Sequence, residues 1–391
     1  MTPKVSRLWG LACLAVVLAL LAGCGSDTNS NATAASSSGT KGGSSKPADL
    51  QQAEAALAKL YAGTDGQPPA SGPKAQGGKK VWEISCAEGA EGCAVFSKTL
   101  KQAAAALGWR LTVFDGNFNA NNAYATGVRQ AVAAGADGII LNGVDCDDVK
   151  QALTEAKAAH VQTVAAQGAF DCAGGGGLLG AVVIPNSVQR TPQATYRVWG
   201  ADKAQMSIAK LGGKGKVLDF ELAGVPHTQP ISAGFKSAMA ACGACKVVTV
   251  PVTLTDLSSN GFAQKVSDAL VRNPDANAIV VPYDNLVTQG IAPALKRAGN
   301  PNVFVLGGEG LASNLALIRN HSGQSADVAY DVGWTAWASA DELNRLFAGQ
   351  PAVPEGFGFT AVDAGHNMPA SGAFASKVDF RAGYKKVWNG T

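Results

Sequence analysis

The stretch AGADGIIL, residues 134–141, decides the fold class of this 391-residue chain. It leads from the end of a helix predicted over 121–134, through Gly135, into a short and continuously apolar strand over 138–141. A strand without polar alternation is typical of a parallel sheet whose two faces are both covered by helices. The stretch therefore predicts an α/β protein built from alternating strands and helices.

The same alternation extends in both directions along the chain. A first series comprises strands over 79–85, 110–114, 138–141 and 162–166, and helices over 96–107, 121–134 and 147–159. A second series comprises strands over 216–221, 247–252, 278–282, 303–307 and 327–330, and helices over 193–211, 232–241, 261–272, 287–298, 313–320 and 334–348. Two similar series predict two Rossmann-like lobes with parallel central sheets. Ligands of such sheets bind beyond the carboxyl ends of the strands, so we expect a cleft shared by the lobes.

The N-terminal segment predicts export from the cytoplasm. Lys4 and Arg7 precede an apolar run over 8–22 that is too short to span a bilayer comfortably, and small residues then lead into Cys24. Residues 1–23 resemble a bacterial lipoprotein signal peptide, in which Cys24 is lipidated, and an ordinary secretory signal is the alternative. Residues 24–78 are expected to form a Ser- and Gly-rich tether, a helix over 49–62 and a loop.

Composition and motifs limit the partners and the chemistry. The formal net charge of +3 falls by two when Lys4 and Arg7 leave with the signal, and no basic stripe exists, so nucleic acid is not an expected partner. No G-x-S-x-G or H-E-x-x-H motif is found, so no enzyme activity is predicted. The four histidines lack metal-ligand spacing, and neither a metal nor a cofactor is expected.

Six cysteines remain after Cys13 and Cys24 are set aside, and an even number in an exported protein indicates disulfides. Six cysteines allow 15 pairings. We predict that nearest neighbours pair: Cys86 with Cys93, Cys146 with Cys172, and Cys242 with Cys245. A redox role for the last pair is the alternative. Because the pair follows a predicted helix rather than preceding one, a structural disulfide is favoured.

Several motifs together resemble those of type I periplasmic binding proteins of the ribose- and galactose-binding kind, over residues 79–391. They are the 134–141 stretch, Gly234-Phe235, Pro282-Tyr283-Asp284 and 307–310 (GGEG). More narrowly, the extra cysteines, the early helix and the stretch DAGHN at 363–367 resemble an actinobacterial group of exported solute-binding proteins.

The resemblance implies a fold in which the chain crosses between the lobes three times, near Asn186, Tyr330 and Ala361. The first lobe would then comprise 79–185 and 331–361, and the second 186–330 and 362–391. It also implies a function: an anchored, monomeric protein at the outer face of the cell membrane captures a small solute and delivers it to the permease of an ABC importer. A ligand sensor of the same fold is the alternative.

At the positions that match the sugar-binding arginines of this family, this chain has almost no arginine. The candidate ligand-binding residues are Glu88, Glu91, Gln167, His227, Gln229, Tyr283, Asp284, Glu309, Tyr330 and Trp334. These groups are mostly acceptors and neutral donors, so a neutral polyol or a polar solute with an amine is expected rather than an acid. Structural alternatives remain open: Asp284 as a helix cap, Glu88 and Glu91 as solvated loop charges, and Trp334 as core packing.

Overall fold

The computed structural model describes residues 46–168, 172, 176–185, 191–259, 261–300 and 302–390. The predicted signal peptide, Cys24 and the expected lobe crossing near Asn186 lie outside these ranges. None of the helices within them is long and apolar enough to cross a membrane.

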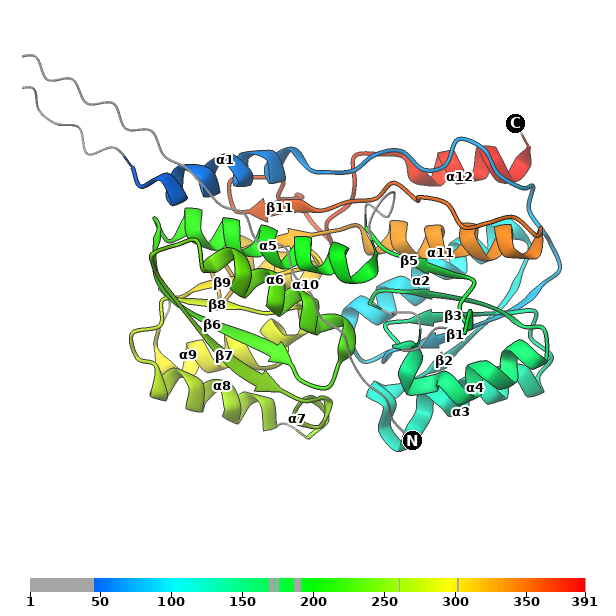
Figure 1. Cartoon of the computed structure of the whole chain (residues 1–391), viewed down its shortest axis with the longest axis horizontal. Coiled ribbons are helices and arrows are strands. Elements are labelled where there is room, and N and C mark those ends of the chain that lie inside the picture. The colour runs from blue at the N-terminus through cyan, green and yellow to red at the C-terminus, as the bar shows by residue number, and fades with distance from the viewer. Residues whose placement is uncertain are drawn as a thin grey trace, which may run out of the picture. The chain divides into compact units, whose positions relative to one another are not determined.

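The first lobe is built on a five-stranded parallel sheet with the strand order β2-β1-β3-β4-β5 (Figure 1). The strands are β1 (Lys80–Ser85), β2 (Arg110–Asp115), β3 (Gly138–Asn142), β4 (Gln162–Ala166) and β5 (Ala181–Val183). Its helices are α2 (Glu91–Leu107), α3 (Ala123–Ala133), α4 (Cys146–Ala158) and α11 (Val332–Phe347), and a 3-10 turn, η1, covers Asn117–Asn122. The predicted stretch 134–141 enters β3, which is buried along its whole length as expected for a central parallel strand.

The second lobe is built on a six-stranded sheet with the order β11-β10-β9-β8-β6-β7, in which only the β10–β11 pair is antiparallel. The strands are β6 (Lys214–Leu222), β7 (Ala244–Val252), β8 (Ala278–Val280), β9 (Phe304–Gly307), β10 (Ala326–Ala329) and β11 (Thr360–Asp363). The helices are α5 (Pro192–Lys210), α6 (Gln229–Met239), α7 (Leu254–Ser258), α8 (Gly261–Arg272), α9 (Ala292–Ala298) and α10 (Ala312–Arg319), with turns η3 (Pro226–Thr228) and η4 (Val287–Ile291).

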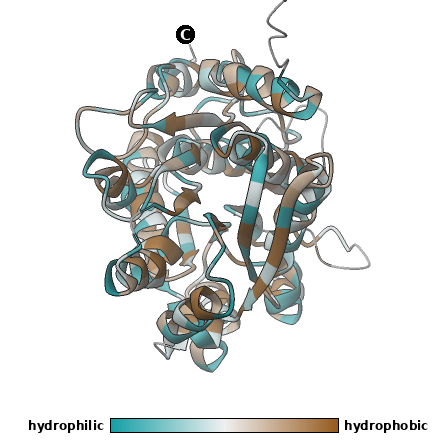
Figure 2. Cartoon of the chain, turned by 90° about the vertical axis from the view of Figure 1, so that its left-hand side faces the viewer, coloured by the Kyte–Doolittle hydropathy of each residue, from teal (hydrophilic) through white to brown (hydrophobic). Residues whose placement is uncertain are grey.

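In Figure 2 the second lobe, on the left in Figure 1, faces the viewer. Its strands contain both hydrophilic and hydrophobic stretches. Strand β6 begins with the exposed Lys214 and is buried from Val217 to Phe220, where helices cover both of its faces. The buried part positions the carboxyl end of the strand, where the chain turns toward the first lobe.

Helix α1 (Ala48–Ala62) packs on α5 and β11 of the second lobe. The chain then runs over residues 63–78 to the first lobe, and we call this segment the N-terminal strap (Figure 1). The backbone N–H of Thr64 donates to Phe359 O at 3.0 Å, that of Gly66 to Gly356 O at 2.7 Å, and that of Ala75 to Trp388 O at 3.0 Å. The expected helix is therefore present, and the loop that follows it packs against both lobes.

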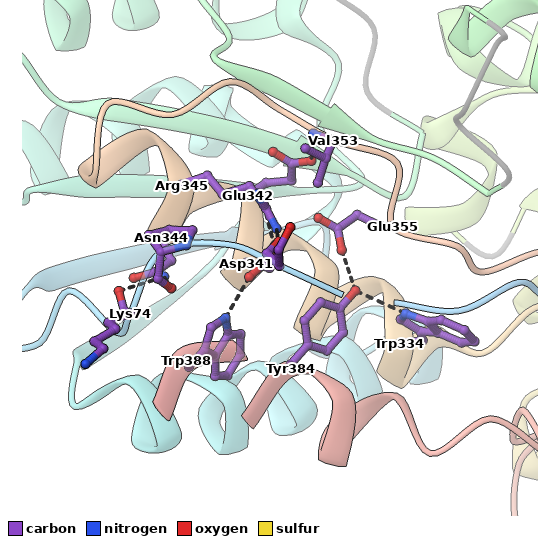
Figure 3. A network of polar contacts seen from close by, with 12 residues as sticks. Lys74, Trp334, Asp341, Glu342, Asn344, Arg345, Val353, Glu355, Tyr384 and Trp388 are labelled. Carbon is purple, nitrogen blue, oxygen red and sulfur yellow. Dashed lines mark hydrogen bonds and ion pairs between the residues drawn. The ribbon is translucent and has the colours of Figure 1, made fainter. Parts of the chain in front are cut away.

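Helix α12 (Phe380–Asn389) was expected in the second lobe, and this expectation is wrong. Its apolar stripe, formed by Phe380, Tyr384, Val387 and Trp388, is buried, and the helix packs against α11 of the first lobe. The Trp388 indole Nε1 donates to Asp341 Oδ1 at 2.6 Å, and the Tyr384 hydroxyl contacts the Glu355 carboxyl (Figure 3). The aromatic face of α11 explains the placement, because Trp334 and Trp337 supply the matching surface.

The three disulfides join nearest neighbours, as predicted: Cys86–Cys93, Cys146–Cys172 and Cys242–Cys245. The last pair links the turn after α6 to the start of β7. Its position at the C-terminal end of a helix agrees with a structural disulfide rather than a redox pair.

Candidate functional site

A cavity of about 90 Å³ lies where the carboxyl ends of strands from the two lobes face each other. From the first lobe it is lined by Cys86, Ala90, Gly92, Cys93, Phe118, Tyr124, Gly143, Asp148 and Gln167. From the second lobe it is lined by Leu222, Val225, His227, Leu254, Leu257, Tyr283, Asn285 and Glu309. A solute held there would touch both lobes at once.

Four of the predicted ligand-binding residues line this cavity: Gln167, His227, Tyr283 and Glu309. Each follows a strand of a parallel sheet, namely β4, β6, β8 and β9 respectively. Because the carboxyl ends of parallel strands lie at one edge of the sheet, residues far apart in the sequence meet there. The Tyr283 hydroxyl is buried in the described structure without a hydrogen-bond partner, so a bound solute can supply one.

His227 connects the two lobes directly. Its Nδ1 lies 2.8 Å from Oδ2 of Asp145, the residue that precedes α4 in the first lobe, and both side chains are buried. Gly168 makes this approach possible, because a Cβ at that position would lie 2.4 Å from the imidazole Cδ2. Any larger residue at position 168 would therefore push the lobes apart.

Glu309 approaches the first lobe in a similar way. The backbone N–H of Asp284 donates to its Oε2 at 3.1 Å, while a Cβ at Gly92 would lie 2.7 Å from its Oε1. Burial, and after it the neighbouring Asp284, raises the pKa of Glu309 to about 8. The surroundings of Glu309 therefore favour the neutral carboxyl group over the carboxylate.

Asp284 does not line the cavity and has a supporting role. The residue is fully buried, its Oδ1 accepts from the backbone N–H of Gly308, and its Oδ2 accepts from that of Leu311, both at 2.9 Å. These bonds fix the loop that carries Glu309. Lys203, buried beneath the loops, donates from Nζ to the carbonyl oxygens of Val281 at 2.8 Å and Pro282 at 2.9 Å.

Four other predicted residues also lie outside the cavity lining. Glu88 accepts from the hydroxyls of Ser85 and Ser97 within the first lobe, and Gln229 is exposed at the start of α6. Tyr330 is buried behind the cavity against Trp199, although its hydroxyl lies 3.5 Å from Gln167 Nε2. Trp334 is fully buried and stacks on Phe380, so we assign it to the core.

Glu91, the remaining predicted residue, crosses the interface between the lobes. Its Oε1 accepts from the backbone N–H of Ala312 at 3.0 Å, and its carboxylate contacts the Ser313 hydroxyl, at the N-terminus of α10. A carboxylate at a helix N-terminus accepts otherwise unpaired N–H groups and faces the positive end of the dipole. Glu91 therefore stabilises the closed arrangement of the lobes.

We expect Glu91→Ala to open the solute-free protein and to weaken solute binding about fivefold, which corresponds to about 1 kcal/mol for a lost charge-assisted contact. An increase in the radius of gyration by small-angle X-ray scattering would show the opening. Glu88→Ala is the matched control, because Glu88 bonds only within the first lobe. Equal radii for Glu91→Ala and the unmodified protein would contradict the assignment.

Several residues of the cavity lining were not among the predicted site residues. Phe118 lies in η1, where Asn117, Phe118 and Asn119 all have positive φ, so no helical or strand periodicity marks it. Asp148 lies in the first turn of α4, where acidic residues are common without any ligand. The cluster of asparagines at 117–122 was the only available signal, since asparagine tolerates the left-handed conformation.

The described residues include no group of three His, Cys, Asp or Glu side chains that could hold a metal ion. Aromatic rings, carboxyl groups, two amides and an imidazole surround the small cavity, a mixture of apolar and polar groups that is typical of small-molecule sites.

Comparisons with known proteins place this geometry in a family. A family model described as a periplasmic binding protein domain matches residues 88–351, whereas a search of curated proteins found no match. Among solved structures, a solute-binding protein of an ABC transporter from Mycobacterium smegmatis with bound glycerol has a TM-score of 0.63 at 18% identity, covering 77% of this chain and 100% of that one.

Two further structures are similar. A sugar ABC transporter protein from Yersinia enterocolitica has a TM-score of 0.65 at 18% identity, covering 81% of this chain and 95% of that one. A solute-binding protein from Agrobacterium vitis bound with tagatopyranose has a TM-score of 0.64 at 18% identity, covering 76% and 100%. At this identity the likeness establishes the fold, and the family match covers most of the two lobes. The chain belongs to the periplasmic binding protein family and has its two-lobed type I fold.

Proposed function

We propose that this protein captures a small polar solute of the sugar or polyol kind between its lobes and delivers it to the permease of an ABC importer. The observation that carries the proposal is the cavity lined by residues of both lobes. A solute that contacts both lobes stabilises their closed arrangement, because only there are all of its contacts made. The closed surface then becomes the one that the permease recognises.

The N-terminal segment indicates where in the cell the protein works. The resemblance of residues 1–23 to a lipoprotein signal supports export and lipidation of Cys24. A lipid anchor at the outer face of the membrane would keep a monomeric binding protein near its permease. The structural neighbours named above bind glycerol and a sugar, which supports a solute of that kind.

A thermal-shift screen of the purified protein tests the capture of a solute. A ligand at 100 times its dissociation constant adds about 2.7 kcal/mol of stability, which raises the melting temperature by a few degrees. The panel contains sugars, polyols, amino acids, nucleosides, amines and aromatic acids. A clear rise with one class supports solute capture, and no rise with any class contradicts it.

We expect Tyr283→Ala and Glu309→Ala each to weaken binding of the solute found in this screen about tenfold or more, or about 1.4 kcal/mol. Both side chains line the cavity, and truncation removes contacts made only in the complex. Gln229→Ala is the control, because Gln229 is exposed and outside the lining. Unchanged affinity by calorimetry in both cavity variants would overturn the site assignment.

A further inference from the structure

The described lining of the interlobe cavity contains carboxyl groups. Among the described residues that line it, none is lysine or arginine. Carboxyl groups come from both sides: Asp148 from the first turn of α4 and Glu309 from the loop after β9. An anionic solute would meet carboxyl groups from both lobes and, among the described lining residues, neither lysine nor arginine, so the lining disfavours acids.

The nearest buried lysine serves the scaffold instead. Lys203 is fully buried, its ammonium donates to the carbonyl oxygens of Val281 and Pro282, and it lies 4.2 Å from the centre of a Trp199 ring. It is absent from the cavity lining. Burial lowers the pKa of Lys203 to about 8, against the opposing effect of Asp327 and other acids. Its charge therefore compensates the buried acids below the site rather than a bound solute.

The described lining holds no lysine or arginine that could pair with Glu309. The carboxyl group is buried, and burial and the charge of Asp284 raise its pKa, against the opposing effects of the Asp284 backbone N–H and of Lys203. A positively charged group placed beside Glu309 would stabilise its ionised form and would gain a charge-assisted hydrogen bond.

The rest of the lining suits the body of an organic cation. Phe118, Tyr124 and Tyr283 contribute aromatic rings, and the faces of such rings attract ammonium groups. Leu254 and Leu257 add apolar surface.

We propose that the solute of this cavity carries an ammonium group, with the charge paired with the carboxyl groups that line the cavity, Asp148 and Glu309, and the carbon body against the aromatic rings. The solute class is thus small polar amines, including amino-polyols. This inference rests on the proposed solute-binding function and specifies the ligand of that same site.

Isothermal titration calorimetry with a charge series tests the inference. Aminopropanediol, glycerol and glycerate share one size and differ in carrying a positive, zero or negative charge. Choline and its neutral carbon isostere dimethylbutanol form a second matched pair. We expect each cation to bind at least about tenfold tighter than its neutral counterpart, and glycerate to bind more weakly than glycerol.

Two charge-neutralising variants locate the effect. Asp148→Asn and Glu309→Gln should each reduce the preference for the cation over its neutral counterpart about fivefold or more. Gln229→Ala should change neither affinity. Circular dichroism spectra identical to that of the unmodified protein would show that the variants fold.

The outcomes separate the two proposals. If neutral sugars or polyols bind as tightly as the cations, or if the variants leave the preference intact, the inference is wrong and solute capture stands. If neither the charge series nor the broad thermal-shift panel binds, both proposals are overturned. A cation preference lost in both variants establishes the ligand class.

Discussion

Replacing Trp388 with alanine is expected to lower the free energy of unfolding by about 3–5 kcal/mol, because truncating a buried tryptophan removes apolar contacts and leaves a cavity. Trp388 is buried in α12, and its ring stacks on Trp337 of α11 with the ring centres 5.2 Å apart. Tyr384, one turn earlier in α12, stacks on Trp388 at 5.5 Å. Loss of the indole would therefore loosen the whole contact between α11 and α12.

A polar contact adds to this loss. The indole Nε1 of Trp388 donates to Oδ1 of the fully buried Asp341, whose Oδ2 accepts from Arg345 Nε at 2.6 Å (Figure 3). Alanine would leave one carboxylate oxygen without this donor. Trp388→Phe separates the two effects, because phenylalanine keeps most of the apolar contact and loses the hydrogen bond, at a cost of about 1–3 kcal/mol.

Urea unfolding followed by circular dichroism measures both variants. Asn389→Ala is the control, since Asn389 is the exposed neighbour of Trp388 in the same helix. We expect the order of stability to be control, then phenylalanine, then alanine. A loss below about 1 kcal/mol for Trp388→Ala would show that the packing of α12 on α11 is dispensable.

This aromatic contact also shows what local sequence pattern does and does not determine. The apolar stripe of α12 indicates a buried face, but nothing in its spacing tells which of two lobes supplies the partner. The partner face on α11 carries Trp334 and Trp337, three residues apart, which is the spacing of one helix face. Trp334 was a candidate ligand contact on its position in the chain, and the stacking of Phe380 on its ring assigns it to the core.

More of the fold than of the site could be predicted from the sequence. Each central strand is a short apolar run, so the lobes and most elements could be predicted from local pattern. The resemblance to the family's sugar-binding positions led to Gln167, Tyr283 and Glu309, which line the cavity. Other positions depend on backbone conformation and on closure: Phe118 of the lining lies on a left-handed turn, and Glu91, outside the lining, contacts α10.

Glu83 is expected to make the protein less stable as the pH rises from about 4.5 to about 7. It lies in the centre of β1, is fully buried, and its Oε2 has no hydrogen-bond partner in the described structure. Its Oε1 accepts from Asn142 Nδ2 at 2.9 Å and lies 2.6 Å from Ser97 Oγ. Burial raises the pKa of Glu83 from 4.5 to about 7, against the opposing effects of its contacts with Ser97 and Asn142.

The sign of the effect follows from proton binding. Between these two pKa values the folded protein holds a proton on Glu83 that the unfolded chain has released, so the free energy of unfolding falls as the pH rises. Below pH 4.5 both states are protonated and Glu83 costs nothing. Above pH 7 the full cost is present, about 3 kcal/mol for a shift of this size.

Glu83→Gln removes the titration while keeping the shape of the side chain. Unfolding by urea at a series of pH values should show the variant gaining about 3 kcal/mol on the unmodified protein between pH 4 and pH 8. Asp219, Glu309 and Glu342 also have raised pKa values, but they are present in both proteins and cancel in the difference. The comparison therefore isolates position 83.

Glu155→Gln is the control, because Glu155 lies at the surface and its pKa is lowered by the hydrogen bond from Arg129. Its difference curve should therefore show no such gain. Parallel curves for Glu83→Gln and the unmodified protein would mean that Glu83 ionises freely in the folded state. A gain confined to Glu83→Gln would instead identify a buried acid behind the Cys86–Cys93 wall of the cavity that destabilises the first lobe at neutral pH.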